Sequence, residues 1–397
     1  MTDNLRSLFL LDPDVTFLNH GSFGACPRSV FERYQAWQVQ LERQPVAFID
    51  PTRGLSDWMR NSRIAVAEEV GADPDEIVGL TNATEALNIV AQSMDLQPDD
   101  EILTTDHEYA ALDKTWAYVA RRTGAKIVRV TIPLPLTNAQ AFTDAMLAGI
   151  TPKTRILFLS HITSATALVF PIEDIVAEAK RRDITTIIDG AHSPGHIPLD
   201  LTALDADYYS GNCHKWMMAP KGSAFLYARR NLQHKINPLI ISHGWTEKAN
   251  EPDAVGFFGD SPFIDGFQVQ GTRDPSAWLT VPESIAFRRQ HGWDAVAARC
   301  RDLAQETAAR VAAITGLSPF SSSEFCAPQM VAMPVPNCDP MELKLALLNQ
   351  YGIEIPCFNW QKFTIVRLSV QGYNTLADMD RLVNALRSIL PAMAKAA

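Results

Sequence analysis

The sequence predicts an α/β protein whose larger part is a mostly parallel sheet of seven strands flanked by helices, followed by a smaller α+β part. Three observations predict this fold. From about residue 60 to residue 230, short β-branched and apolar runs alternate with amphipathic stretches. The runs are apolar throughout, which is typical of strands that are covered on both faces. After about residue 275 the alternation ends, and long helical stretches with a few strands between them follow.

Each expected element follows from these patterns. The strands of the large sheet are expected at 76–80, 101–104, 126–130, 155–160, 184–189, 206–210 and 223–227. Apolar residues at helical spacing predict helices between them at 84–94, 108–123, 139–149 and 172–182. In the C-terminal part we expect helices at 276–290, 293–315 and 340–351, strands at 329–336, 353–357 and 363–370, and a last helix from 375. Thr375 and Asp378 match a capping box at its start.

The same change of pattern predicts two domains. We expect residues 26–285 to form the large domain, and residues 1–25 with 286–397 to form the small one. The connection at 243–275 is rich in Gly, Pro and aromatic residues. We interpret it as a loop of the functional site rather than a linker, and we expect 243–267 to shape a substrate pocket.

Composition and charge exclude several classes of protein. The 397 residues include 35 Lys and Arg against 45 Asp and Glu, a net charge of −10, so we expect neither nucleic acid nor an anionic membrane as partner. No apolar run approaches the roughly 18 residues that span a bilayer, and the N-terminus lacks a signal cleavage site. We therefore predict a cytoplasmic protein. The six cysteines form no CxxC pair, so a zinc knuckle or a dithiol redox site is not expected.

Turns that follow strands are where open α/β sheets bind ligands. After the first expected strand, Asn82, Ala83 and Thr84 lead into a helix, whose free N–H groups would suit an anion such as phosphate. An ordinary helix cap would have the same composition.

Asp189 ends an apolar strand, where an unpaired carboxylate is costly. Its partner could be a protonated ring nitrogen, a helix N-terminus or a metal. His192 and His196 follow it, but no second acidic cluster accompanies them, so we predict no metal site.

Lys215 lies in a loop with aromatic and Met residues. Desolvation there would favour a neutral amine that forms an imine with an aldehyde, whereas a solvated surface lysine would do nothing. A phosphate anchor, a ring-nitrogen partner and an amine are together the parts that pyridoxal 5′-phosphate (PLP) needs.

With these residues identified, the sequence resembles the fold-type I, PLP-dependent enzymes of the class V aminotransferase superfamily, and within it the isopenicillin N epimerase-like branch. The motifs that carry the resemblance are LNHGSFGACP (18–27), TNATEALN (81–88), DHEY (106–109), SHITSATALVFPI (160–172), DGAHSPGHIPLD (189–200), HKW (214–216), QGTRDPSAWL (270–279) and VRLSVQGYN (366–374). They extend over nearly the whole chain.

The resemblance implies a role for each matching residue. Lys215 would form the Schiff base with the cofactor, and Asp189 would keep the ring nitrogen protonated. The phosphate would be held by Asn82, Ala83, Thr84, Asn212 and His214. Ser164 and His192 would donate to the phenolic oxygen, and either His107 or Tyr109 would stack on the ring. Gly271 and Thr272 would reach the phosphate from a second subunit, which implies a homodimer with shared active sites.

Substrate contacts follow in the same way. Arg367 would bind the α-carboxylate of an amino-acid substrate, and Asn19 and His20 would also contact the substrate. The glycine-containing turn at 19–24 would bring His20 or Phe23 over the substrate. In cysteine desulfurases a nucleophilic cysteine on a mobile loop precedes this arginine, whereas Cys357 is expected in or beside a strand. We therefore interpret Cys357 as a packed thiol.

The implied chemistry starts with an external aldimine and a quinonoid formed by loss of the α-proton to Lys215. Reprotonation with Tyr109, His20 or water as acid would give epimerisation, loss of a β-substituent would make the protein a C–S lyase of cysteine conjugates such as hercynylcysteine sulfoxide, and protonation of the cofactor would give transamination. We favour the epimerase-like reaction and keep the lyase and the aminotransferase as alternatives. A scaffold protein without chemistry is disfavoured because Lys215, Asp189 and Arg367 are all present.

Overall fold

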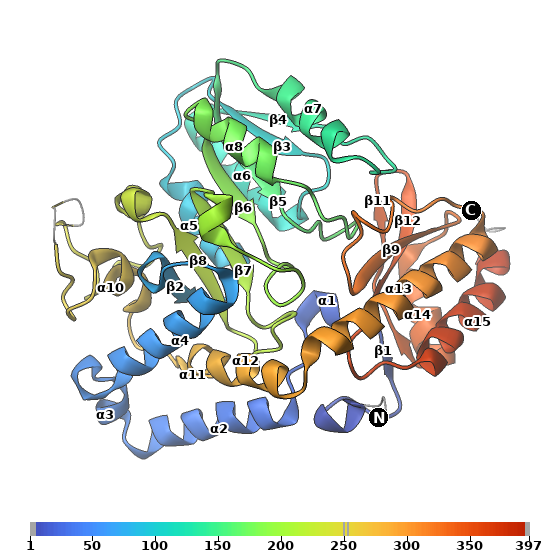
Figure 1. The fold of residues 1–397 in the computed structure, drawn as a ribbon, viewed down its shortest axis with the longest axis horizontal. Helices are drawn as coiled ribbons and strands as arrows, with labels where there is room; N and C mark the ends of the chain where they lie inside the picture. Colours follow the sequence, from blue (N-terminus) through green and yellow to red (C-terminus); the bar gives the residue numbers. More distant parts are fainter. Residues whose placement is uncertain (1–4, 249–250, 252–253, 394–397) are drawn as a thin grey trace.

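A computed structural model of the protein describes residues 5–248, 251 and 254–393. Its large sheet has seven strands in the order β2-β8-β7-β6-β5-β3-β4 (Figure 1). The strands are β2 (Ile77–Leu80), β3 (Glu101–Thr105), β4 (Lys126–Val130), β5 (Thr154–Ser160), β6 (Thr185–Asp189), β7 (Tyr208–Asn212) and β8 (Ala224–Ala228). The neighbours from β4 to β7 pair in parallel, and β8 runs antiparallel to both β7 and β2. The predicted mostly parallel sheet of seven strands is confirmed.

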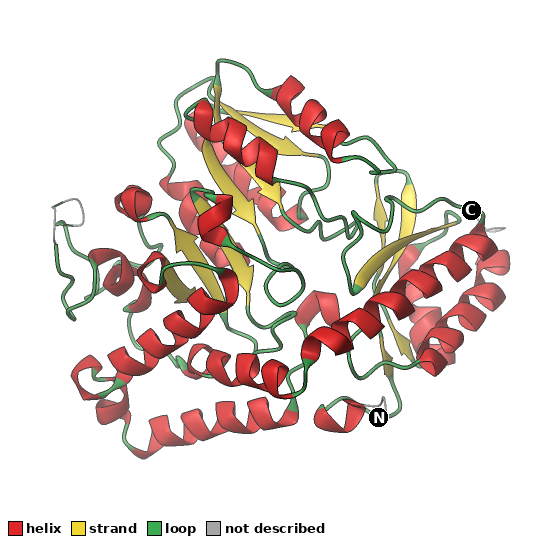
Figure 2. Cartoon of the chain, viewed as in Figure 1, coloured by secondary structure: helices red, strands yellow, loops and turns green. Residues whose placement is uncertain are grey.

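Helices cover both faces of this sheet (Figure 2). Alternate residues of β5 face opposite layers, because Phe158 packs in one apolar cluster and Leu157 and Leu159 in another. The Phe158 layer contains α5 (Ala83–Ser93), α6 (Ala110–Thr123) and α10 (Pro262–Gln268). The opposite layer contains α4 (Leu55–Val70), α7 (Ala139–Gly149) and α8 (Glu173–Arg181). Burial on both faces explains why the strands are apolar along their length.

The C-terminal part contains a second sheet, in which β11 (Cys357–Trp360), β12 (Phe363–Ser369) and β9 (Met330–Val335) pair antiparallel in that order. A separate apolar cluster joins it to α13 (Trp293–Thr315), α14 (Pro340–Tyr351) and α15 (Leu376–Met393). At the start of α15, the carboxylate of Asp378 accepts the N–H of Thr375 (2.9 Å). This is one of the two reciprocal contacts of a capping box.

The N-terminal segment joins this C-terminal part. Strand β1 (Thr16–Phe17) pairs in parallel with β10 (Ile353–Glu354). The short helix α1 (His20–Phe23) then lies between the two sheets (Figure 1). The remaining elements are η1 (Leu5–Leu8), α2 (Arg28–Arg43), α3 (Pro45–Ile49), η2 (Pro51–Arg53), η3 (Pro74–Glu76), α9 (Leu201–Leu204) and η4 (Arg230–Lys235). The exact domain boundaries at 25/26 and 285/286 stay a prediction.

Two expected elements are divided in the structure. The helix expected at 276–290 consists of α11 (Ser276–Leu279) and α12 (Val281–Gln290), with a proline in the first turn of α12. Because Pro282 has no N–H, a helix readily starts there but does not run through it. The strand expected at 353–357 ends at Glu354, and β11 begins separately at Cys357.

Among the residues that the structure describes, no helix is both long enough and apolar enough to cross a membrane. Within the expected pocket stretch 243–267, positions 249–250 and 252–253 lie outside the described residues.

Candidate active site

A cavity of about 670 Å³ lies at the ends of β5, β6 and β7; we call it the lysine cavity. It brings together most of the residues that the sequence singled out. Those that line it are Asn82, Ala83, Thr84, Tyr109, Ser164, Asp189, His192, Asn212, His214, Lys215 and Arg367. Residues more than 280 positions apart in the chain therefore share one site.

Lys215 presents its amine to the ring of His192, with 3.0 Å between Nζ and Nε2. The indole N–H of Trp216 approaches the other ring nitrogen, Nδ1, at 3.4 Å. Burial lowers the pKa of Lys215 to about 7, with a further lowering by the positive charge of Arg367 and an opposing effect of Asp189. A desolvated lysine of this kind carries a nucleophilic amine near neutral pH.

Asp189 ends β6, and its carboxylate accepts the N–H of Ala191 at 2.9 Å. The side chain is buried, and no cation lies within ion-pair distance of it among the described residues. Burial raises the pKa of Asp189, with Lys215 acting in the opposite direction. A buried carboxylate that lacks a counterion is suited to a cationic ligand.

A second buried acid, Glu108, lies beside Asp189. One oxygen of Glu108 accepts from the N–H (2.9 Å) and the hydroxyl (2.6 Å) of Ser160, and the other accepts from the hydroxyl of Thr105 (2.7 Å). Ser160 is the register partner of Asp189 on the adjacent strand. Burial raises the pKa of Glu108 to about 8 despite these hydrogen bonds, with a smaller rise from the charge of Asp189.

The N-terminus of α5 faces the same cavity. The N–H of Ala83 donates to the amide oxygen of Asn212 (2.9 Å), which ties the helix to the end of β7. Asn82 caps the helix by accepting the N–H of Glu85 (2.8 Å). His214 lies close by, with Nδ1 at 3.0 Å from the carbonyl of Ser223. Because that carbonyl only accepts, Nδ1 of His214 carries the proton.

Arg367 extends from β12 into the cavity and is almost fully buried. Its Nη1 donates to the carbonyl (2.6 Å) and the hydroxyl (3.1 Å) of Ser164, and its Nη2 donates to the hydroxyl of Ser22 (2.9 Å). Within the described chain, Nε has no partner and no carboxylate lies within ion-pair distance. Burial lowers the pKa of Arg367 to about 10, so the guanidinium remains charged and lacks an anion.

Five expected site residues lie outside this cavity: His107, Asn19, His20, Gly271 and Thr272. His107 is fully buried, with Nδ1 at 2.7 Å from the hydroxyl of Thr166, so of the two stacking candidates only Tyr109 reaches the cavity. Asn19 and His20 were expected to contact the substrate, but both are buried and neither lines the lysine cavity. The side chain of His20 turns towards the backbone of Lys215 instead, because the turn is packed on that loop.

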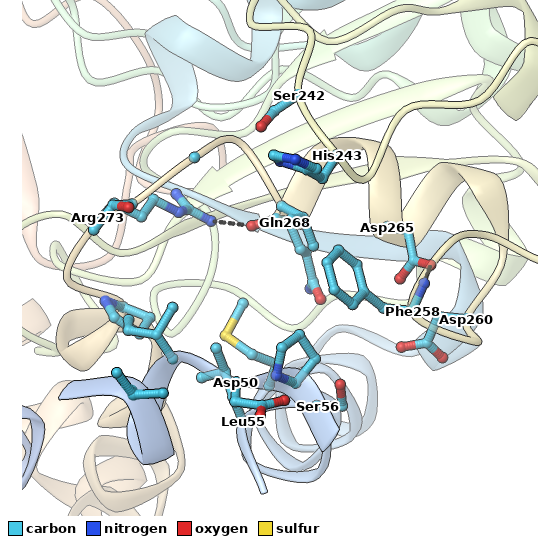
Figure 3. A pocket seen from close by; sticks show the side chains of 18 of the residues that line it. Asp50, Leu55, Ser56, Ser242, His243, Phe258, Asp260, Asp265, Gln268 and Arg273 are labelled. Atoms are coloured by element: carbon cyan, nitrogen blue, oxygen red, sulfur yellow. Dashed lines mark hydrogen bonds between the residues drawn. The ribbon is translucent and has the colours of Figure 1, made fainter. Parts of the chain in front are cut away.

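Gly271 and Thr272 line a different cavity of about 620 Å³, which we call the second cavity. Figure 3 shows it with Arg273, whose guanidinium donates to the carbonyl of Gln268. The aromatic ring of Phe258 and the apolar side chain of Leu55 contribute to its walls. Within one chain, Gly271 and Thr272 therefore do not line the lysine cavity.

Sequence reasoning missed several lining residues. Glu108, Ser22, Phe358 and Trp360 all line the lysine cavity, as does Phe23, which the sequence had offered beside His20 as a residue over the substrate. For Glu108 a signal existed, since the acid occurs in the DHEY turn directly after an expected strand. Ser22 and the β11 residues carry no local signal, because long-range packing brings them to the site.

Cys357 is the first residue of β11, in a strand as expected from the sequence. Burial raises the pKa of Cys357 to about 12, which disfavours a thiolate nucleophile. No group of three or more His, Cys, Asp or Glu side chains in the described chain could hold a metal. His196, one of the two histidines considered as ligands, accepts the N–H of Gln329 at 2.9 Å and stacks on Trp216.

The lysine cavity fits PLP. A buried amine at Lys215 matches its aldehyde. The buried carboxylate of Asp189, for which the described part of the chain offers no counterion, matches a protonated ring nitrogen. The positive end of α5 faces the cavity together with the side chain of Thr84, and a helix N-terminus with a hydroxyl suits a phosphate.

Comparisons with known proteins give the same result. A family model described as "Aminotransferase class-V" matches residues 27–382. The isopenicillin N epimerase of Streptomyces clavuligerus is 34% identical over 392 residues and covers 98% of both chains. That of Amycolatopsis lactamdurans is 35% identical and covers 97% of this chain and 98% of its own. A putative L-cysteine desulfhydrase 1 of Oryza sativa subsp. japonica is 31% identical and covers 95% of this chain and 83% of its own.

Solved structures show the same fold. The cysteine desulfurase CsdA of Escherichia coli has a TM-score of 0.78 at 24% identity and covers 98% of each chain. A variant of C-DES with glycine covalently linked to its PLP has a TM-score of 0.79 at 21% identity and covers 96% of this chain and 98% of its own. Fold type I is thereby confirmed. With a family match over most of its length, the chain belongs to the class V aminotransferase family and is a PLP-dependent enzyme.

Proposed function

We propose that the enzyme removes the α-proton of an amino acid or an amino-acid-bearing substrate, as an isopenicillin N epimerase-like isomerase. The observation that carries the proposal is one cavity in which the desolvated amine of Lys215 lies with the carboxylate of Asp189 and the guanidinium of Arg367, which has no carboxylate partner among the described residues. These groups suit three features of such a reaction, namely proton removal, cofactor binding and carboxylate binding.

The residues proposed to hold the cofactor lie at the ends of five strands of the large sheet, β2, β3, β5, β6 and β7. Lys215 would attach it, Asp189 would pair with the ring nitrogen, and Tyr109 would lie against the ring. The phosphate would rest on Asn82, Ala83, Thr84, Asn212 and His214, and His192 and Ser164 would face the phenolic oxygen. When bound, PLP supplies an electron sink for the substrate α-carbon.

Lys215 is proposed as the base. Its amine is neutral above a pH of about 7 because burial and the charge of Arg367 disfavour the ammonium form. His192 limits where the amine can point, since Nε2 of the ring lies 3.0 Å from Nζ. If Trp216 donates to Nδ1, the neutral ring carries its proton on Nε2 and can donate it to the free amine.

Arg367 is proposed to bind the substrate α-carboxylate. A buried cation without an anion in the described chain is costly, and a carboxylate would remove that cost. Ser164 and Ser22 orient the guanidinium, and its Nε has no partner among the described residues. The planar donor arrangement of arginine suits a bidentate carboxylate.

Epimerisation also needs an acid that returns a proton to the α-carbon. Tyr109 offers the hydroxyl for this role, as it lines the cavity and is 44% exposed in the single chain. His20, the other candidate side chain, has both ring nitrogens engaged outside the cavity. We therefore propose Tyr109 or a water held near it as the acid.

A C–S lyase is the second candidate, favoured by the relatives named as L-cysteine desulfhydrases, one of them 31% identical over 95% of this chain. It would use the same base and carboxylate clamp, with loss of a β-substituent instead of reprotonation. Transamination remains the third alternative. We also propose a homodimer in which Gly271 and Thr272 complete the partner's site, and a cytoplasmic location.

The test begins with the cofactor. We expect the purified protein with added PLP to give, after borohydride reduction, a covalent adduct on Lys215 by mass spectrometry. Lys215→Ala should give none, and Lys215→Arg, which keeps the positive charge, should give none either. An adduct that persists in Lys215→Ala would overturn the assignment of this residue.

The reaction is then assigned with a panel of L-amino acids and cysteine conjugates. D-isomer or α-hydrogen exchange without pyruvate would support the isomerase, pyruvate with ammonia would support the lyase, and a keto acid would support transamination. Arg367→Lys should raise the apparent Kd for amino acids by about tenfold or more, because lysine cannot form the bidentate contact.

A further inference from the structure

The NHGSFG turn, residues 19–24, joins the two groups on which the proposed reaction depends. It lies between the loop that carries Lys215 and the strands β9 and β12 of the C-terminal sheet. Its glycines show how closely it is packed. A Cβ on Gly24 would lie 1.9 Å from the carbonyl oxygen of His214, and one on Gly21 would lie 2.8 Å from both the sulfur of Met330 and the hydroxyl of Ser369. The turn therefore touches both parts of the molecule with no space between.

One end of the turn holds the backbone of Lys215. His20 is fully buried, and its Nε2 lies 3.0 Å from the carbonyl oxygen of Lys215. Because a carbonyl only accepts, this nitrogen carries the proton, and Nδ1 accepts from the hydroxyl of Tyr373 (3.0 Å) and the N–H of Ala25 (3.3 Å). Both ring nitrogens are thus used, which fixes the ring and the carbonyl that it binds.

The middle of the turn holds Arg367. The hydroxyl of Ser22 accepts from Nη2 of that guanidinium at 2.9 Å and lines the lysine cavity. Only one residue, Gly21, separates Ser22 from His20. The backbone of Lys215 and the side chain of Arg367 are consequently linked through three consecutive residues of α1.

We propose that this turn sets the distance and orientation between Arg367 and Lys215, so that a carboxylate bound by Arg367 places the α-carbon within reach of the amine. Ser22 orients the guanidinium, and His20 is a positioning residue that acts through the backbone of Lys215. The proposal rests on the proposed function, because it assumes that Arg367 binds a carboxylate and Lys215 acts on the α-carbon. It assigns His20 a role away from the substrate.

Ser22 is tested in the holoenzyme with two probes that differ only in the carboxylate, L-alanine and ethylamine. Their Kd values are measured from the absorbance change of the bound cofactor. Ser22→Ala should raise the Kd of L-alanine about tenfold, as expected for a lost hydrogen bond to a charged group, and leave that of ethylamine unchanged. Ser22→Thr keeps the hydroxyl and should restore the affinity for L-alanine.

His20 is tested in the protein without cofactor as well as in the holoenzyme. In His20→Ala, hydrogen exchange of a peptide covering 213–219 should become faster, because the carbonyl of Lys215 loses its buried donor. The same variant should weaken the binding of L-alanine more than that of ethylamine, although His20 does not line the cavity. His20→Gln, whose amide can still donate, should recover part of both effects. Tyr373→Phe, which removes only the hydroxyl that orients the ring, should show them in weaker form.

The outcomes separate the two proposals. If the wild-type protein forms no adduct with PLP on Lys215, the proposed function fails and this inference fails with it. If the adduct forms normally and Ser22→Ala binds L-alanine as tightly as the wild type, only the role of the turn is overturned. Equal weakening of L-alanine and ethylamine by His20→Ala would likewise overturn it, because a general disturbance of the site would act on both probes.

Discussion

Burial sets the proton states of two ionisable side chains that line the lysine cavity, Lys215 and Glu108. It lowers the pKa of Lys215 to about 7 and raises that of Glu108 to about 8. In both cases burial removes the hydration that stabilises the charged form, so the neutral form is favoured. Glu108 can therefore lie beside Asp189 without a second full negative charge at neutral pH.

The lowered pKa of Lys215 predicts how fast the protein takes up its cofactor. Only the unprotonated amine attacks an aldehyde, so uptake should rise about tenfold per pH unit below a pH of about 7 and then level off. The measurement is stopped-flow absorbance after PLP is mixed with the apo-protein between about pH 5.5 and 9. Continued acceleration up to the range of an ordinary lysine would contradict a desolvated amine. Free butylamine, measured in parallel, corrects for the ionisation of PLP itself.

The raised pKa of Glu108 predicts a pH-dependent effect on stability. The folded protein holds a proton on Glu108 that the unfolded chain releases between its ordinary pKa of 4.5 and about 8. The stabilising contribution of Glu108 to folding is therefore fully present below pH 4.5 and is lost as the pH rises through 8. Glu108→Gln stays neutral and lacks this loss, so its melting temperature relative to the wild type should increase from pH 5 to pH 8.5. A difference that is constant with pH would show that Glu108 is already ionised in the folded protein. The shift of Asp189 is common to both proteins and largely cancels.

At this scale the sequence predicts residues that follow strands but not those that meet through folding. The sequence indicates Asp189 because it ends an apolar run, and Lys215 because it lies in the loop after the next expected strand. Ser22 reaches Arg367 across 345 positions, and no local pattern indicates such a contact. The choice between His107 and Tyr109 depended on which way each side chain of one turn points, which a spacing of two residues leaves open.

At the scale of elements, the site is built where helices and strands end. The start of α5 is fixed from two sides, by its own cap at Asn82 and by the amide of Asn212 at the end of β7. The strands themselves were predictable, because burial on both faces gives continuous apolar runs. Their order was not, since nothing in the β2 or β8 residues tells that β8 inserts antiparallel between β2 and β7. The break between α11 and α12 could have been found from Pro282.

A matched pair of variants distinguishes a role of the α5 cap in cofactor binding from the stability that any helix cap provides. Asn82 caps α5 at the lysine cavity, and Asn138 caps α7 by accepting the N–H of Gln140 (2.7 Å) at an exposed position away from it. Each change to alanine should cost about 1 kcal/mol of unfolding free energy, the usual value for a lost N-cap. Only Asn82→Ala should also weaken the binding of PLP, which is measured as the Kd of the reduced analogue pyridoxine 5′-phosphate. Equal affinity in both variants would mean that α5 does not help to bind the phosphate.

At the scale of the whole molecule, two cavities divide the residues that the sequence assigned to one cofactor. Gly271 and Thr272 are exposed and line the second cavity, whereas the residues proposed to bind the phosphate within the chain line the lysine cavity. Exposed apolar side chains also occur near the second cavity in sequence, among them Ile241 at 58% and Phe257 at 71% exposure. Such side chains favour coverage by another surface, and a second copy of the chain would bring its own Thr272 with it.

A mixing experiment tests whether the sites are shared between subunits. Thr272→Glu adds a negative charge at an exposed position that is absent from the chain's own lysine cavity, so a self-contained chain should bind PLP normally. In a shared site the charge would repel the partner's cofactor phosphate and abolish adduct formation. Lys215→Ala alone should form no adduct either.

When the two variants are unfolded and refolded together, half of the dimers should be mixed, and each mixed dimer should regain one intact site. Borohydride reduction should then label about a quarter of the sites, all on the Thr272→Glu chain. Full labelling of Thr272→Glu before mixing, or a mass of one 43.9 kDa chain by light scattering, would show that each chain carries a complete site of its own.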